Sequence, residues 1–352
     1  MKIISNETDF KLSEKLESTW PSGKVLLFDI ETTGLKKETT YVYLIGCAYF
    51  EKGTWHIIQY LANSALDEQE IIHKFLNFAN NFDILIHFNG DRFDIPYIDY
   101  KAKYYGFDFD FNKFESYDIY AHAKVLRNFL GFQSMSQKSI ELFLNIFRDD
   151  KYDGGKLIPI YYEYERTSDK KLEELLLLHN HDDIEGMFKI MPILNYLDIL
   201  NGNFIFDNYE ICQNTLILNF TLPYKIDRGF EKNIYDGVNI FAKDFLLQVN
   251  IDFYDGEAMH FISDYENYFY LPDEDKVVHK SVAQFVEKSH KIKATKKNCY
   301  IKKCGKFLPQ KSMLIEPCFA ICGNKKNIYF EYNENILNDT DFLIHYVIEF
   351  IN

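Results

Sequence analysis

Two carboxylates, Asp29 and Glu31, stand one residue apart at the end of an apolar run that begins at Val25. Alternate side chains of a strand point to the same side, so both acids are expected to face one place. Thr32-Thr33-Gly34 then breaks the strand. Two buried carboxylates repel each other, and a divalent cation between them would keep both ionised. The alternative is an exposed strand end that carries two solvated acids.

A third acid follows a second apolar run. The segment Asp83–Phe88 reads as a strand that ends at Asn89-Gly90, and a helix is expected to begin around Phe93. Asp94 then falls in the first helical turn, where the helix dipole favours a negative charge. It either caps this helix or joins the first two acids. Phe93 is either a packing residue or a wedge against a nucleic-acid base.

A fourth acid lies on a predicted helix. Residues four apart share a helix face, so His179 and Asp183 are expected to be neighbours. The apolar stripe that contains them places both side chains inward, and an inward aspartate needs a partner or a metal. Two alternatives remain open: a structural hydrogen bond between the two residues, or Asp182 in place of Asp183 if the helix register differs. His181 is a weaker candidate because it faces another direction.

Taken together, these segments resemble the four acidic motifs of the ribonuclease H-like DEDD 3′–5′ exonuclease superfamily. Phe-Asp-Ile-Glu-Thr-Thr-Gly at 28–34 is similar to the first motif, and the stretch from Asn89 to Asp94 to the second. The chain looks more narrowly like the YprB-like branch, and the resemblance covers about Val25 to Leu200. That narrower likeness rests on Gln137-Lys138-Ser139-Ile140-Glu141, Gly154-Gly155 before Ile158-Pro159, and His179-Asn180 ahead of Asp183.

The resemblance implies two Mg²⁺ or Mn²⁺ ions and hydrolysis of a phosphodiester bond. In such a site one ion activates a water and the other stabilises the leaving 3′-oxygen. The implied metal ligands are Asp29, which would bridge the ions, with Glu31, Asp94 and Asp183. The implied contacts to the 3′ end of single-stranded DNA or RNA are Asn89, Phe93 and Thr32. The superfamily usually has a tyrosine four residues, or a histidine five residues, before the last acid. Here His179 takes the tyrosine spacing, so it is either the general base or a residue that orients the acid or a phosphate.

The elements that must position these residues predict an α/β fold. Strands are expected at Lys24–Ile30, Tyr41–Phe50 and Trp55–Leu61, before the strand that ends at Phe88. The resemblance implies a ribonuclease H-like mixed sheet of five strands flanked by helices. Expected helices are Asp67–Ala79, Phe93–Tyr105, Ile119–Arg127, Ser136–Ile146 and Lys170–Leu200, the last kinked or split at Pro192. We expect a boundary near residue 202, with an exonuclease domain at 1–202 and an accessory α+β domain of unknown role at 203–352. A helix is expected there at Val277–Ser289.

Composition narrows the class of protein. The 352 residues, 47% of them hydrophobic, suit two folded domains. The formal net charge of −14 argues against general adhesion to nucleic acid, but not against an acidic centre neutralised by metal. The stretch Lys288–Lys311 holds nine lysines and no acid, and either guides a single strand or is a solvated loop. No stretch approaches the roughly 20 apolar residues of a membrane span.

The six cysteines do not resemble a disulfide framework, which indicates a reduced, cytoplasmic setting. Cys299, Cys304, Cys318 and Cys322 have spacings too loose to favour a zinc site over buried thiols. The overall prediction is a cytoplasmic, metal-dependent 3′–5′ exonuclease acting on DNA or RNA, with a helicase or other nucleic-acid enzyme as a possible partner. The rival interpretation is a catalytically silent nucleic-acid-binding or scaffold module with the same fold.

Overall fold

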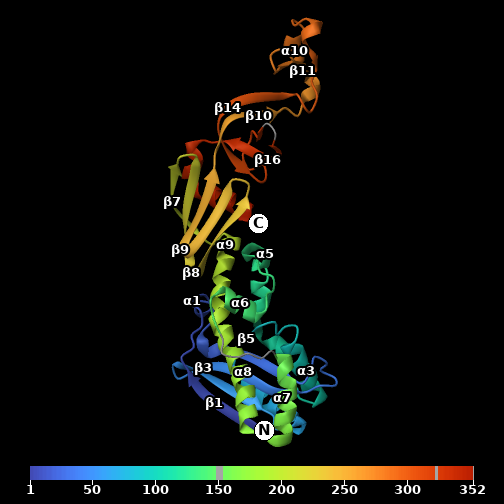
Figure 1. Cartoon of the computed structure of the whole chain (residues 1–352), viewed down its shortest axis with the longest axis vertical. Coiled ribbons are helices and arrows are strands. Elements are labelled where there is room, and N and C mark those ends of the chain that lie inside the picture. Colours follow the sequence, from blue (N-terminus) through green and yellow to red (C-terminus); the bar gives the residue numbers. More distant parts are fainter. Residues whose placement is uncertain (148–153, 322–323, 352) are drawn as a thin grey trace. The chain divides into compact units, whose positions relative to one another are not determined.

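The protein is described by a computed structural model that covers residues 1–147, 154–321 and 324–351. The chain divides into two compact units, Met1–Leu197 and Asp198–Asn352 (Figure 1). Each unit has its own sheets and its own buried core, and the candidate acids all lie in the first.

A mixed sheet of six strands forms the centre of the first unit, in the order β1-β4-β3-β2-β5-β6. The strands from β1 to β2 are antiparallel, whereas β2, β5 and β6 are parallel. Their bounds are β1 Lys2–Thr8, β2 Val25–Thr32, β3 Val42–Glu51, β4 Thr54–Leu61, β5 Ile84–His87 and β6 Glu115–Asp118. The predicted α/β class is confirmed, with one strand more than the five expected. Two strands were not predicted by residue range: the half-exposed edge strand β1, whose mostly polar sequence gives a weak strand signal, and the four-residue strand β6.

Strand β2 shows how the two faces of the sheet differ. Its even-numbered residues pack towards α2 (Glu68–Ala79), where the rings of Phe28 and Phe75 lie 5.3 Å apart. Its odd-numbered residues point to the opposite face, where Asp29 meets α8 (Lys170–Ile190). The period-2 alternation of the strand therefore buries an apolar face and aims Asp29 and Glu31 at α8.

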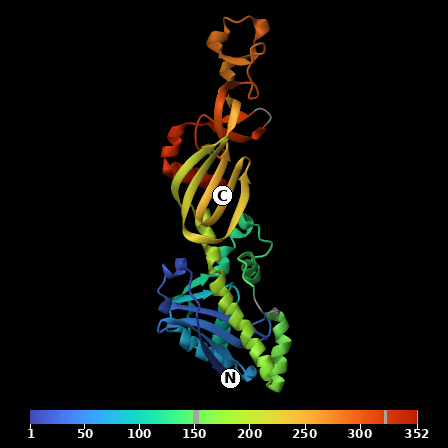
Figure 2. The ribbon, with the colours of Figure 1, turned by 60° about the vertical axis from the view of Figure 1, so that its left-hand side comes forward.

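Helix α8 carries the third acidic segment and begins at a defined cap. Asp169 is its N-cap, and the carboxylate accepts the Lys171 amide at 2.8 Å. Helix α7 (Gly154–Thr167) lies beside α8 (Figure 1, Figure 2). The long helix predicted over 170–200 is split: a 3₁₀ segment, Met191–Tyr196, contains Pro192 and leads into α9 (Leu197–Asn201). Proline lacks the amide hydrogen that a continuous helix needs.

A buried ion pair ties the remaining helices to the sheet. Lys101 of α3 (Asp94–Tyr104) lies 3.1 Å from Glu68 of α2, and Glu68 also accepts the backbone amide of Val42 at 2.7 Å. Both charged side chains are almost fully buried. The shorter helices are α1 Glu14–Glu17, α4 Ile119–Ala123, α5 Leu126–Leu130 and α6 Gln137–Phe143.

The second unit is β-rich, which refines the α+β expectation. Its strands form an antiparallel sheet (β7 Ile205–Cys212, β8 Thr215–Tyr235, β9 Val238–Asp252), a closed barrel (β10 Tyr254–Phe261, β14 Tyr300–Gln310, β15 Phe319–Ile321, β16 Asn324–Glu331) and a small sheet (β11 Tyr268–Leu271, β12 Lys276–His279, β13 Ile292–Lys293). The helices are α10 Lys280–Ala283 and α11 Thr340–Ile351.

The helix predicted over 277–289 is wrong. Val277 and Val278 belong to strand β12, where they pair with Tyr270 and Phe269, and only the four residues of α10 are helical after them. The β-branched valines favour the strand, and the aromatic cross-strand partners stabilise it. Among the described residues, no helix has the length and apolar character needed to cross a membrane.

Candidate active site

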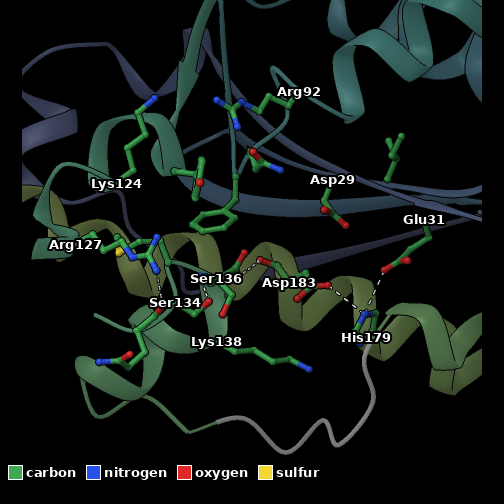
Figure 3. Close-up of a pocket in the computed structure, with 17 residues that line it drawn as sticks. Asp29, Glu31, Arg92, Lys124, Arg127, Ser134, Ser136, Lys138, His179 and Asp183 are labelled. Carbon is green, nitrogen blue, oxygen red and sulfur yellow. Dashed lines mark hydrogen bonds and ion pairs between the residues drawn. The ribbon is translucent and has the colours of Figure 1, made fainter. Parts of the chain in front are cut away.

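A cavity of about 980 Å³ opens where the end of β2 meets α8 (Figure 3). Asp29 and Glu31 reach it from β2, and His179 and Asp183 reach it from α8. The residues that complete the lining are Ile30, Phe88, Asn89, Arg92, Tyr120, Lys124, Arg127, Gln133, Ser134, Met135, Ser136, Gln137 and Lys138. Three acids from two distant segments thus face one space.

Asp29 is held by a relay of two side-chain amides, those of Asn180 and Gln59, which runs across the strands of the sheet. The Asn180 side chain donates to Asp29 Oδ2 at 3.0 Å, while its Oδ1 accepts Gln59 Nε2 at 2.9 Å. Gln59 Nε2 also contacts the Leu177 carbonyl oxygen at 2.9 Å, so it anchors to α8 at two points. Gly46 lies between Asp29 and Gln59 in the strand register, and a Cβ there would lie 2.0 Å from Asn180 Oδ1. The missing side chain of Gly46 is what lets Asn180 reach the sheet.

Burial and repulsion act together on two of the carboxyl groups. Burial, followed by the charges of Asp183, Asp94 and Glu31, raises the pKa of Asp29 well above its ordinary value, and the Asn180 hydrogen bond opposes this. Burial also raises the pKa of Asp94 to about 7. Asp94 Oδ1 accepts the Ile30 amide at 3.2 Å, beyond the last residue of β2 that pairs with β5. A group of acids with raised pKa values gains most from a cation that neutralises it.

The His179 imidazole lies between the other two carboxylates. Its Nε2 is 3.2 Å from Asp183 Oδ2 and 3.4 Å from Glu31 Oε1 (Figure 3). The Tyr43 hydroxyl lies 3.5 Å from the other Glu31 oxygen, and the Tyr43 ring stacks on Tyr161 at 4.2 Å. Glu31, His179 and Asp183 bring their ligand atoms within 4.8 Å of one another, close enough to hold one metal ion.

Asn89 is held in an unusual backbone conformation at the end of β5. Its φ of 64° lies in the left-handed region, which asparagine tolerates better than most residues. Asp118 Oδ1 accepts the Asn89 amide at 2.8 Å and also the Ala121 amide at 3.2 Å, which caps α4. The next residue, Gly90, donates its amide to His87 Nδ1 at 3.1 Å. A Cβ on Gly90 would lie 2.6 Å from the His87 ring, so only glycine fits this turn.

The sequence-predicted residues divide into two groups. Asp29, Glu31, Asn89, His179 and Asp183 line the cavity. The three others do not line it. Asp94 is buried beside Asp29, the Phe93 ring lies 5.5 Å from Tyr97, and the Thr32 hydroxyl bonds the Gly34 carbonyl at 2.9 Å.

The helix register selects between the two adjacent acids of α8. Asp183 lines this cavity, whereas Asp182 lines a separate pocket of about 180 Å³. Asp182 forms a different group of close ligand atoms, with His181 and Glu185. Asp183 is therefore the acid that can act together with Asp29 and Glu31.

Sequence reasoning missed the basic side of the cavity. Arg92, Lys138 and the neighbouring pair Lys124 and Arg127 come from three separate segments, so no large local cluster of charge marks them. The lysine-rich stretch 288–311 was the obvious basic signal instead. There Lys302 pairs with Asp275 at 2.6 Å and Lys303 with Glu331 at 2.6 Å, so these two charges are compensated within the second unit.

The cysteine spacing yields no zinc centre among the described residues. Cys299 is buried, Cys304 is exposed and Cys318 is intermediate, and the metal-capable groups of described residues contain no cysteine. Cys322, which the spacing argument also used, lies outside the described residues.

The donor set of the cavity suits hard divalent cations. Carboxylate oxygens are the preferred ligands of Mg²⁺ and Mn²⁺, and Asp29, Glu31 and Asp183 present several of them to the same space. Burial and three neighbouring carboxyl groups raise the pKa of Asp29, opposed by the Asn180 hydrogen bond, so a bound cation would favour the ionised form of Asp29. The site therefore fits a metal-binding role.

Comparison with known proteins shows which parts of this chain are similar to other proteins. Residues 26–195 match the family model described as RNase_H superfamily. The DNA polymerase of Methanocaldococcus jannaschii is 38% identical over 125 residues, which are 32% of this chain and 8% of that protein. A family B DNA polymerase structure from the archaeon Pyrobaculum calidifontis is matched over 69% of this chain and 35% of that one, with 16% identity and a TM-score of 0.38. The chain thus spans only a small part of these polymerases. Residues 26–195, just under half of the chain, are thus similar to the RNase_H superfamily, and the mixed sheet of the first unit is consistent with a fold of that kind.

Proposed function

We propose that the first unit is a metal-dependent 3′–5′ exonuclease of the DEDD type that hydrolyses phosphodiester bonds of DNA or RNA. The observation that carries the proposal is the meeting of Asp29, Glu31 and Asp183 in one cavity that also bears four cationic side chains. The acids suit divalent ions, and the cations suit phosphate groups. When bound, two Mg²⁺ or Mn²⁺ ions would supply an activated water and stabilise the leaving oxygen.

The protein's own residues have separate tasks in this proposal. Asp29, Glu31 and Asp183 hold the ions, and Asp94, buried beside Asp29, acts through water. His179 lies next to two of these acids, where it can accept a proton from the attacking water. Asn89 lines the cavity at the end of β5 and is placed to contact the terminal nucleotide.

The test is a time course on single-stranded DNA and RNA labelled at either end, with Mg²⁺ or Mn²⁺. We expect a ladder that shortens from the 3′ end and disappears with a chelator. Asp29→Asn and Asp183→Asn should lose the ladder. Asp182→Asn is the matched control, because it removes a neighbouring charge on the same helix that lines a different pocket. Equal loss in Asp182→Asn and Asp183→Asn would contradict the assignment.

One observation favours a second candidate, a nucleic-acid-binding module without catalysis. His179 Nε2 contacts both Glu31 and Asp183, so a protonated imidazole would occupy the space between them and offset part of their charge without a metal. This module would bind oligonucleotides and cut none under any of the metal conditions. Wild-type cleavage that requires Asp29 and Asp183 would rule it out.

A further inference from the structure

The cavity is divided by charge. Its acids are Asp29, Glu31 and Asp183, whereas the other charged residues of the lining, apart from His179, are the cations Arg92, Lys124, Arg127 and Lys138. We name these four cations the basic wall. In Figure 3, Arg92, Lys124 and Arg127 lie on the side away from Glu31 and His179, and Lys138 extends below Asp183. This concentration is notable in a chain of net charge −14, because it shares one cavity with three acids and does not include the lysine-rich stretch of the sequence.

Arg92, Lys124 and Arg127 of the basic wall can accept an anionic ligand. The side chains of Arg92 and Lys124 are exposed and make no hydrogen bond or ion pair with any residue that the structure describes. Arg127 is oriented by the backbone, since its Nη2 donates to the Gln133 carbonyl at 2.8 Å and its Nε to the Phe132 carbonyl at 3.4 Å. Carbonyl groups do not cancel its charge, so the guanidinium keeps its capacity for an anion.

Two aromatic rings, those of Phe88 and Tyr120, line the same cavity as the basic wall and the acids. Phe88 and Tyr120 are half-buried, with ring centroids 5.8 Å apart in an edge-to-face contact. Phe88 precedes Asn89, and Tyr120 follows Asp118 and Ile119 at the start of α4. Exposed ring area beside cations is the combination that binds unpaired bases and their phosphates without sequence preference.

We propose that the basic wall holds the phosphates of a single nucleic-acid strand, with an unpaired base against Phe88 or Tyr120, so that the strand's end reaches Asp29 and Asp183. This proposal rests on the proposed function for the identity of the reacting end. It adds the residues that bind and position the strand, which are distinct from the metal-binding acids. A duplex presents stacked base faces that cannot contact these rings, so it has less to gain from this surface.

The electrostatic part of the proposal has a calculable size. Binding of a single strand weakens with salt by a slope of about 0.7 for each phosphate that the protein neutralises. Removing two contacts, in the double variant Arg92→Ala/Lys124→Ala, should lower that slope by about 1.4. At about 0.1 M salt this corresponds to binding about 25-fold weaker.

The experiment measures binding of a fluorescent single-stranded oligonucleotide in Ca²⁺, across a salt series. The matched control is Lys170→Ala/Lys171→Ala, which removes two exposed positive charges at the start of α8, about 18 Å along the helix from Asp183. We expect the control to bind like the wild type and Arg92→Ala/Lys124→Ala to bind about 25-fold more weakly with a smaller slope. Equal effects of the two double variants would overturn the proposal, as would a blunt duplex that competes as well as the single strand.

Failure of this proposal can be told apart from failure of the proposed function. Wall-dependent binding without cleavage in Mg²⁺ or Mn²⁺ would leave the wall assigned and remove the exonuclease. Cleavage that is lost in Asp29→Asn and unaffected in Arg92→Ala/Lys124→Ala would keep the exonuclease and remove the wall.

Discussion

Asn180 should matter for metal binding although it does not line the cavity. It is fully buried, and it links Gln59 on β4 to Asp29 on β2 through hydrogen bonds of 2.9 and 3.0 Å. In Asn180→Ala, Asp29 loses the amide that fixes the direction of Oδ2. The carboxylate then keeps the burial and the repulsion from Asp183 that raise its pKa, so it holds a proton more tightly and a metal less tightly.

The size of the effect follows from the bond that is lost. A hydrogen bond to a charged group is worth about 1.5–3 kcal/mol. At about 1.4 kcal/mol for each tenfold step, this predicts a Kd for Mn²⁺ about 10- to 150-fold higher. Outer contacts that orient metal ligands typically change affinity by about 10- to 100-fold, which agrees. Gln59 keeps its bond to the Leu177 carbonyl, so little further disruption is expected.

The assay is calorimetric titration of Mn²⁺ into the wild type, Asn180→Ala and the control Asn77→Ala. Asn77 is an exposed asparagine of α2, the helix that covers the opposite face of the sheet. Circular dichroism should show that all three proteins are folded. A folded Asn180→Ala protein whose Kd for Mn²⁺ stays within about threefold of the wild type would refute the reasoning.

Three further outcomes are expected. Gly46→Ala would place a Cβ 2.0 Å from Asn180 Oδ1, so it should lower the free energy of unfolding by about 1–3 kcal/mol and weaken Mn²⁺ binding. An unchanged midpoint of chemical denaturation would contradict this. Lys101→Met leaves the Glu68 charge buried without its cation and should cost about 3–5 kcal/mol, whereas Lys103→Met removes an exposed ion pair and should cost less than about 1 kcal/mol. Because burial raises the pKa of Asp94 to about 7 from 3.8, the metal-free protein should lose stability as pH rises through that interval, and Asp94→Asn should flatten the dependence of melting temperature on pH.

The parts of the site that the sequence predicts are those with short-range periodicity. The spacing of Asp29 and Glu31 on a strand, and of His179 and Asp183 on a helix, determines which residues share a face. Pro192 interrupts α8 because of its own covalent structure, and the break is also readable from sequence. Long-range packing places Asp94 beside Asp29 and outside the cavity lining, and nothing in the sequence around Asp94 indicates this position.

Features that depend on several distant segments could not be predicted in this way. The relay from Gln59 through Asn180 to Asp29 needs β2, β3, β4 and α8 in register, with Gly46 leaving the space. The four cations around the cavity come from three segments, none of them rich in basic residues. Conversely, the lysine-rich stretch 288–311 is conspicuous in sequence, yet Lys302 and Lys303 pair with acids of the same unit.

The two hydrogen bonds of Asp118 connect the turns that carry the aromatic residues of the cavity. One carboxylate oxygen of Asp118 accepts hydrogen bonds from the amides of Asn89 and Ala121, so a single side chain connects the turn after β5 to the first turn of α4. Phe88 and Tyr120 adjoin these two turns, so Asp118 helps to fix the position of one ring relative to the other. In Asp118→Ala the amides of Asn89 and Ala121 both lose this acceptor, so hydrogen exchange should become faster at both. An equal increase at the two amides would show that the two turns open together.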